Sequence, residues 1–361
     1  MIYYDVTKMA GARQKSGLTR VSSRLQEELG TEVSPVAWDG RRKYFVSENQ
    51  KEPQHFSAND WLLTVELFSS AERPGFSEWL TNRKCRTAAM FYDAIPLRFP
   101  HVTWPQSVQR HPLHMKMLAD FDHVFAISRS SQQDLIGFWS WQGVEPRAKV
   151  STIEFGADFD GSTRNTLSVP AKAGVRPQLL CVGIVEPRKN QGFLLDVCEA
   201  LWREGVDFDL HIVGRVNPHF GKPLERRFKQ TGKRERRFHF HPAASDAMLK
   251  KLYGEARALA LPTQAEGCGL PLLEALWHGV PCVCSDLPVL RENADGAKCG
   301  SLGGGGCVTA IVDNLTDWQA KLHSVLTDET VHRRLMAESI KRSLPRWADS
   351  ARMLLQELAS S

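Results

Sequence analysis

Two glutamates eight positions apart, Glu266 and Glu274, stand on either side of a glycine-containing segment. Carboxylates suit sugar hydroxyls, because each accepts charge-assisted hydrogen bonds, often two at once. Gly267 and Gly269 allow tight turning and close approach of the backbone to a phosphate where a strand ends and a helix begins. The alternative interpretation, a capping glutamate plus a solvent-facing one, does not explain why Glu274 sits among apolar helix residues.

A basic pair, Arg188 and Lys189, follows another predicted strand, which ends at Gly183. A cation beside a helix N-terminus can neutralise a diphosphate that the free amides also bind. Taken alone this signal is weak, since basic residues in such loops are surface residues more often than ligands. Together with the two glutamates, it predicts a site for a phosphorylated sugar.

The elements that position these residues follow an α/β pattern, in which short apolar runs alternate with amphipathic stretches. We expect two doubly wound, Rossmann-like domains that face each other across a cleft and bind ligands beyond the carboxyl ends of their strands. The predicted strands are 1–5, which is a first buried strand, and 61–65, 87–92, 123–128, 179–183, 208–214, 258–262 and 280–285. The predicted helices are 130–139, with Ser130 or Ser131 as the N-cap, 193–203 and 270–278.

The domain boundaries follow from a change in composition. Residues 161–178 lack periodicity and are rich in Gly, Pro and small residues, which is typical of a linker. We therefore predict an acceptor-binding domain at 1–165, a linker at 166–178, a donor-binding domain at 179–344 and a C-terminal helix at 345–361 that crosses back to the first domain.

The bulk composition is that of a soluble globular protein of 361 residues, with no apolar run long enough to span a membrane and no secretory signal. None of the eight cysteines forms a C-x-x-C motif, so we interpret them as buried thiols in a reducing compartment, the cytosol. The net charge of +5 is concentrated at 8–24 and 222–237. The default interpretation of such runs is a solvated protein surface. The second interpretation is that the N-terminal run attracts the protein to the anionic inner face of a membrane, as a peripheral contact.

The segments EGCGLPLLEA (266–275) and HGVPCVCSDLPVLRE (278–292) make a specific resemblance. They resemble glycosyltransferase family 4, retaining enzymes of the GT-B fold whose motif is E-x7-E. The resemblance extends over nearly the whole chain, because three further segments match the family: SGLTRV (16–21), YDAIPLRFP (92–100) and FAISRSSQQDL (125–135). Within the family, the sequence is most similar to bacterial mannosyltransferases of surface-polysaccharide assembly.

The resemblance implies a role for each matching residue. Lys189, with Arg188 beside it, would hold the donor diphosphate. Glu274 would bind the ribose hydroxyls, and Glu266 would bind the hydroxyls of the transferred sugar. The remaining assignments are Gly17, whose loop would close over the diphosphate; Gly183, Gly267, Cys268, Gly269 and Leu270, whose backbone would approach the donor; and Tyr92 and Asp93, which would line the acceptor side.

The chain departs from the family pattern at two positions. Many members have Arg directly after the glycine equivalent to Gly183, where this chain has Ile184, and we expect Arg188 or an N-terminal Arg to supply that charge. Many members also have His where this chain has Tyr92. A tyrosine can still donate a hydrogen bond, so this change does not exclude activity.

The resemblance implies that the configuration of the anomeric carbon is retained, and the sequence offers no obvious protein nucleophile for that carbon. We therefore expect a front-face displacement. We expect a nucleotide-sugar donor, GDP-mannose first, no other cofactor and no metal, with a glycan or polyprenyl-diphosphate-linked saccharide as acceptor. Two D-x-D pairs, Asp158 with Asp160 and Asp207 with Asp209, are the metal-dependent alternative, although nothing guarantees that they converge.

Two other functional classes remain as alternatives. A sugar-nucleotide 2-epimerase shares the two-domain architecture but lacks the EGxGLPxxE segment. A non-catalytic protein that binds sugar nucleotides or nucleic acid would draw on the basic run 222–237. That run has few aromatic residues for base stacking, so we expect no nucleic-acid partner.

Overall fold

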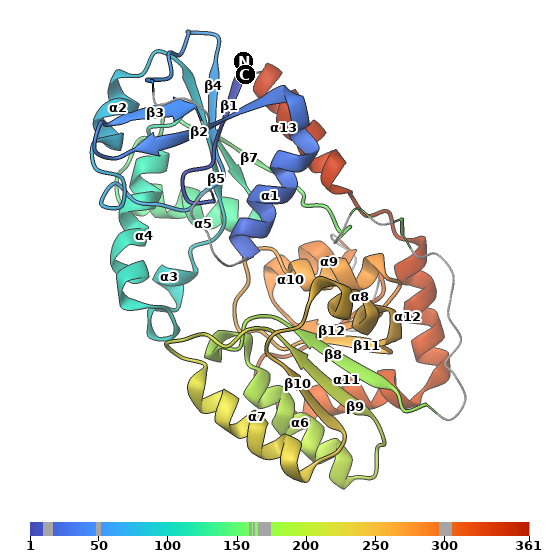
Figure 1. The fold of residues 1–361 in the computed structure, drawn as a ribbon. Coiled ribbons are helices and arrows are strands. Elements are labelled where there is room, and N and C mark those ends of the chain that lie inside the picture. The colour runs from blue at the N-terminus through green and yellow to red at the C-terminus, as the bar shows by residue number, and fades with distance from the viewer. Residues whose placement is uncertain are drawn as a thin grey trace. The chain divides into compact units, whose positions relative to one another are not determined.

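The computed structural model describes residues 1–9, 17–47, 52–158, 161, 163–164, 175–295 and 305–360. Ser16, Asp160 and most of the predicted linker 166–178 lie outside these ranges. The chain divides into two compact units (Figure 1). The first unit comprises Met1–Gly156 and Pro345–Ser361, and the second comprises Ala157–Leu344.

The described part of the first unit contains a seven-stranded sheet in the order β3-β2-β1-β4-β5-β6-β7. Its neighbouring strands are parallel except for β2 and β3. Because the strand order reverses between β1 and β4, the topological switch point lies between them. The strands are β1 (Ile2–Asp5), β2 (Val33–Asp39), β3 (Tyr44–Ser47), β4 (Trp61–Thr64), β5 (Arg86–Phe91), β6 (His123–Ala126) and β7 (Lys149–Thr152).

Helices cover both faces of this sheet, with α1 and α13 on one side and α4 and α5 on the other (Figure 1). The C-terminal helix α13 is held by Trp347, which stacks on Phe155, and by the Ser350 hydroxyl, which donates to the Glu154 carbonyl at 2.7 Å. The helices are α1 (Gly17–Leu29), α2 (Phe76–Asn82), α3 (Ile95–Arg98), α4 (Pro105–Leu118), α5 (Arg129–Trp141) and α13 (Trp347–Ser360), with 3-10 turns η1 (Gly30–Glu32) and η2 (Pro100–Val102).

The second unit has, in its described residues, a six-stranded parallel sheet in the order β10-β9-β8-β11-β12-β13, with its switch point between β8 and β11. The strands are β8 (Gln178–Val182), β9 (Asp209–Val213), β10 (Phe238–His241), β11 (Ala258–Leu261), β12 (Cys282–Ser285) and β13 (Cys307–Ala310). The helices are α6 (Gln191–Arg203), α7 (Lys222–Arg234), α8 (Asp246–Glu255), α9 (Leu270–Trp277), α10 (Pro288–Asp295), α11 (Leu315–Thr327) and α12 (Glu329–Lys341), with the 3-10 turn η3 (Pro187–Lys189).

These elements confirm the predicted α/β class and the predicted strands to within two residues at each end. All four residues of β4, β6, β11 and β12 are buried, as expected of parallel strands covered on both faces. The predicted N-cap of α5 was wrong. The cap is Ser128, whose hydroxyl accepts from the Ser131 amide at 3.0 Å, because the strand ends at Ala126 and the chain turns two residues earlier than expected.

The basic run at 222–237 falls on α7 and the turn after it, where acidic side chains pair with it. Arg227 contacts Asp196 at 2.5 Å, and Lys229 contacts Glu225 at 2.6 Å. This pairing favours the solvated-face interpretation of the run. In the N-terminal run, Lys8 pairs with Glu72, and Arg24 with Glu27 and Glu28. Across the described helices, none is long and apolar enough to cross a membrane.

A fully buried histidine, His114 on α4, ties this helix to the loop after β4. Its Nδ1 donates to the Phe68 carbonyl at 2.6 Å, and burial lowers its pKa to about 3. A histidine in the unfolded chain titrates near 6.5, so below that pH the unfolded chain binds more protons than the folded one. Neutral His114 therefore contributes stability that is lost as the pH falls from 6.5.

We predict that His114→Asn, which retains a donor near the Nδ1 position, lessens this sensitivity to acid. Between pH 7.5 and pH 5, urea unfolding of the variant should lose about 2 kcal/mol less free energy than wild type. The exposed His55→Asn is the control and should follow wild type. Equal acid sensitivity in all three proteins would show that His114 does not contribute.

Candidate functional site

The predicted donor residues follow the two strands at the switch point of the second unit. Gly183 to Lys189 come after β8, and Ala265 to Leu270 come after its neighbour β11. Since parallel strands end at the same edge of a sheet, these two loops meet, although they are about eighty residues apart in the chain. Tertiary structure thus brings together the two segments that the sequence singled out.

The centre of the site is an ion pair between Lys189 Nζ and Glu266 Oε1. Both side chains are largely buried, with exposed fractions of 11% and 8%. Lys189 lies at the end of the 3-10 turn η3, where its stem also covers Gly183. A cation and a carboxylate are therefore held together at the switch point, both still partly accessible to a ligand.

Arg188 is engaged by protein groups. Glu186 Oε1 accepts from Arg188 Nε at 3.0 Å and from Nη2 at 2.7 Å, and the Ala265 carbonyl accepts from Nη1 at 2.6 Å. Asn217 in turn donates to the other Glu186 oxygen at 2.8 Å. Arg188 thus ties the two loops together beside Glu266. Sequence reasoning missed Glu186 and Asn217, although a carboxylate two residues before an arginine is a local signal for such a pair.

Glu274 lies on α9 and is 4% exposed. Its Oε2 accepts from the Tyr253 hydroxyl at 2.9 Å, and the Tyr253 ring stacks on His278. A buried carboxylate needs such a donor, because desolvation without a partner is costly. Tyr253, on α8, gave no signal in the sequence because it is twenty-one residues from Glu274.

The glycine loop leads directly into α9. Gly269 is the N-cap residue in the left-handed conformation at φ 81°, and no side chain caps the helix. Pro271 has no N–H, and the Leu272 amide donates to the Gly269 carbonyl at 2.9 Å, so what faces the end of the loop is the positive end of the helix dipole. Cys268 is buried, and its carbonyl accepts from the Asn293 amide. Leu270 begins the helix, so the left-handed conformation of Gly269 joins the loop to α9.

A further carboxylate, Asp313, joins three loops at this edge of the sheet. It accepts from Asn190 Nδ2 at 2.6 Å and from Gln264 Nε2 at 3.0 Å. Asn190 follows β8, Gln264 follows β11 and Asp313 follows β13. This bridge holds the loops around Lys189 in place, and no sequence pattern indicated it.

The predicted residues of the first unit lie at the start of α1 and directly after β5. Gly17 begins helix α1. Tyr92 is buried and its hydroxyl donates to the Val65 carbonyl at 2.6 Å, while burial raises its pKa. Asp93 Oδ1 accepts from the Ile95 amide at 2.9 Å, and its carbonyl contacts His111 Nε2 at 2.8 Å. The hydroxyl of Tyr92 thus already has an acceptor within the protein.

The D-x-D pair Asp207 and Asp209 contacts a cation of the protein itself. Arg176 lies 3.2 Å from Asp207 and 3.1 Å from Asp209, at the amino end of β9. Asp158 is buried, and its partner Asp160 lies outside the described residues. Within the described ranges, no three His, Cys, Asp or Glu side chains are grouped so as to hold a metal ion.

We predict that Gly269→Ala destabilises the protein by about 1–3 kcal/mol, since φ 81° is strained for alanine and the new Cβ would lie 2.5 Å from Leu290 Cδ2. Gly254→Ala, in the exposed helical backbone of α8 with open space around it, is the control and should gain about 0.5–1 kcal/mol. Urea unfolding measures both. A neutral Gly269→Ala would mean that the turn is not constrained.

The amino-acid sequence matches the family model described as "Glycosyl transferases group 1" over residues 176–328. The serotype-specific mannosyltransferase WbdA of Escherichia coli is 29% identical over 98% of this chain, and a second WbdA sequence is 30% identical over 80% of it. These alignments cover 46% and 39% of the relatives, so the chain spans less than half the length of the curated relatives it matches.

Solved structures share the fold along the whole chain. HepE of Anabaena, solved with UDP and glucose, superposes with a TM-score of 0.72 at 13% identity, covering 100% of this chain and 99% of that one. Sucrose-phosphate synthase of Thermosynechococcus elongatus superposes with a TM-score of 0.71 at 14% identity and the same coverage. The family match, the relatives and the two-sheet fold together show that this chain belongs to the GT-B glycosyltransferases.

Proposed function

We propose that the chain is a retaining glycosyltransferase that moves a hexose, mannose first, from GDP-mannose to a glycan or a polyprenyl-diphosphate-linked saccharide in surface-polysaccharide assembly. The observation that carries this proposal is the Lys189–Glu266 pair at the switch point, beside the uncapped N-terminus of α9. The relatives named serotype-specific mannosyltransferase and O-antigen chain mannosyltransferase support the choice of sugar and pathway.

The donor diphosphate would lie against Lys189 and the positive end of the α9 dipole. A diphosphate carries more negative charge than Glu266, so it competes for the ammonium that Glu266 holds in the absence of donor. Glu266 is then released to accept hydrogen bonds from the hydroxyls of the transferred sugar. Arg188 stays with Glu186 and keeps the two loops aligned.

The ribose would be held by Glu274, whose carboxylate already receives one hydrogen bond from Tyr253 at 2.9 Å. That bond orients the carboxyl group before the nucleotide arrives. The nucleoside therefore meets a preorganised acceptor, and little entropy is lost on binding.

The reaction we propose is a front-face displacement. The acceptor oxygen bonds to the anomeric carbon on the side from which the diphosphate leaves, while the bond from that carbon to the diphosphate oxygen breaks with its electron pair. The leaving oxygen takes the acceptor's proton. Lys189 and the dipole of α9 would stabilise the charge that develops on the diphosphate, and we expect most of the rate enhancement to arise there. No metal is required in this scheme.

Lys189→Ala should lower the rate of mannosyl transfer from GDP-mannose about 100-fold or more, because the developing charge loses its cation. Transfer to octyl α-mannoside, followed with radiolabelled donor in EDTA, measures the effect. Lys229→Ala, which removes an exposed ion-paired lysine of α7, is the matched control and should keep the wild-type rate. A Lys189→Ala enzyme as fast as wild type would exclude this mechanism.

Tyr253→Phe should raise the KM for GDP-mannose about 5- to 10-fold, since Glu274 loses the bond that orients it toward the ribose. With a 2′,3′-dideoxyribose analogue of the donor, which has no ribose hydroxyls to offer Glu274, wild type and variant should bind alike. If the variant lost affinity for both donors equally, Tyr253 would not act through the ribose hydroxyls.

Thermal shifts with GDP, UDP and ADP would identify the base, because bound nucleotide stabilises the folded state.

A further inference from the structure

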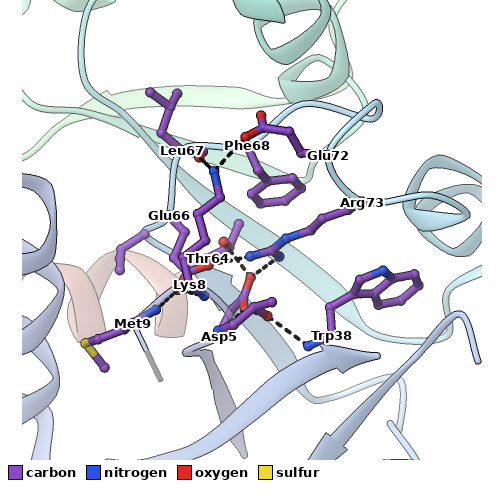
Figure 2. A network of polar contacts seen from close by, with 12 residues as sticks. Asp5, Lys8, Met9, Trp38, Thr64, Glu66, Leu67, Phe68, Glu72 and Arg73 are labelled. Carbon is purple, nitrogen blue, oxygen red and sulfur yellow. Dashed lines mark hydrogen bonds and ion pairs between the residues drawn. The ribbon is translucent and has the colours of Figure 1, made fainter. Parts of the chain in front are cut away.

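The switch point of the first unit holds a second charged network, which the proposed reaction does not use. Asp5 is the last residue of β1, and Glu66 lies two residues beyond its neighbour β4. Their carboxylates converge on the guanidinium of Arg73, from the loop after β4 (Figure 2). All three side chains are almost completely buried, with exposed fractions of 0%, 4% and 3%.

Arg73 is the only cation that contacts both carboxylates among the described residues. Its Nη1 donates to Asp5 Oδ2 and its Nη2 to Glu66 Oε2, while the guanidinium carbon lies 3.6 Å from the centre of the Phe68 ring. Burial and then the charge of Asp5 raise the pKa of Glu66 to about 7, and Arg73 opposes that shift. Without Arg73, two like charges would lie uncompensated in the interior, which is strongly unfavourable.

The network fixes the backbone that follows β1. Glu66 Oε1 accepts from the amides of Lys8 at 2.6 Å and Met9 at 2.9 Å, as Figure 2 shows. Asp5 Oδ1 accepts from the Thr7 hydroxyl at 2.5 Å, and that hydroxyl accepts from the Trp38 amide at 2.8 Å. One guanidinium thereby sets the position of residues 7–9 through the two carboxylates.

The same network leads to the residues predicted to line the acceptor side. Val65, next to Glu66, supplies the carbonyl that accepts from Tyr92. The ammonium of Lys8 binds the Leu67 carbonyl and pairs with Glu72 at 3.0 Å. The loops after β1, β4 and β5 are therefore joined at the edge where an open parallel sheet binds its ligand.

We propose that Arg73 is a positioning residue for the acceptor, acting through Glu66 and Asp5 on the loops at the carboxyl edge of the first sheet. The inference rests on the proposed transferase function and adds the residue that sets its acceptor side. Arg73 does not touch substrate. It keeps the Lys8–Met9 backbone and the loop after β4 in the geometry that binds the acceptor saccharide.

The chain offers a matched control at the opposite edge of the same sheet. Arg83, just before β5, is equally buried and pairs with Asp122 at 3.0 Å, just before β6. It also donates to the carbonyls of Leu80 and Asp120. Arg73→Met removes two buried ion pairs, whereas Arg83→Met removes one and leaves Asp122 paired with Arg147 at 2.5 Å. A merely structural role therefore predicts a loss of stability, larger for Arg73→Met, with no acceptor-specific change in KM in either variant.

The experiment compares these two variants with wild type, using GDP-mannose as donor and octyl α-mannoside as acceptor probe. Arg73→Met should raise the acceptor KM about 10-fold or more and the donor KM by a smaller factor, because the loop after β4 is displaced directly while residues 7–9 only lead toward Gly17. Arg83→Met should leave both KM values within about twofold of wild type. Equal changes in the two variants, or a rise in donor KM alone for Arg73→Met, would overturn the inference.

A measurement independent of turnover separates this inference from the proposed function. Deuterium exchange of a peptide covering residues 6–9 should speed up at least tenfold in Arg73→Met and remain as in wild type in Arg83→Met, because the Lys8 and Met9 amides lose their fixed acceptor. Unchanged exchange in Arg73→Met overturns the inference whatever the activity. A different outcome is also possible: exchange is faster in a folded Arg73→Met variant, but the wild-type protein transfers no mannose. That outcome contradicts the proposed function and not the role of Arg73 in fixing residues 7–9.

Glu66→Gln is the second variant, for use if Arg73→Met does not fold. Its amide oxygen can still accept from the Lys8 and Met9 amides, but it has no charge for Arg73. We expect exchange at residues 6–9 and the acceptor KM to change in the same direction as in Arg73→Met, by a smaller factor. A wild-type value for both quantities would overturn the inference.

Discussion

A buried carboxylate must have a cation or a hydrogen-bond donor beside it, and at the switch point of both sheets of this protein that partner is a cation. In the first unit Asp5 and Glu66 share Arg73, and in the second Glu266 pairs with Lys189. The loops diverge at these points, beyond the last paired residues of the strands. The ion pairs therefore decide where the loops lie, and everything proposed for the site depends on that placement.

The two networks differ in how much water reaches them. Arg73 and its partners are sealed in the interior, where desolvation makes an unpaired charge costly and the arrangement rigid. Lys189 and Glu266 remain about a tenth exposed, so a diphosphate can reach the ammonium. The first network suits positioning, and the second suits exchange of a protein carboxylate for a ligand phosphate.

The placement of Arg188 refines the expected division of labour on the donor side. Its guanidinium binds Glu186 and the Ala265 carbonyl, so we expect Lys189 to be the main cation for the proposed diphosphate. We expected Arg188 or an N-terminal Arg to supply the charge that is missing at Ile184, and in this structure the guanidinium of Arg188 is directed at protein groups. The N-terminal end of the α9 dipole supplies positive potential at the same edge.

Local sequence was sufficient for much of this molecule. Apolar runs of parallel strands, the glycine loop before α9 and the pair of glutamates all lie within short windows, so the α/β class and the family could be predicted, while the donor role of the two loops stays a prediction. The N-cap of α5 was missed by two residues because strand ends are set by the register with neighbouring strands, as at β6.

Only the tertiary structure decided which side chains meet. Arg73 is 68 residues from Asp5, Tyr253 is 21 residues from Glu274, and Asp313 is 123 residues from Asn190. None of these pairs has a local pattern, because a hydrogen bond depends on distance in space and the crossover connections bring distant loops to one edge. The sequence by itself determined that carboxylates, cations and glycines stand at strand ends. The packing of the sheets determined which of them are neutralised by the protein and which remain accessible to a ligand.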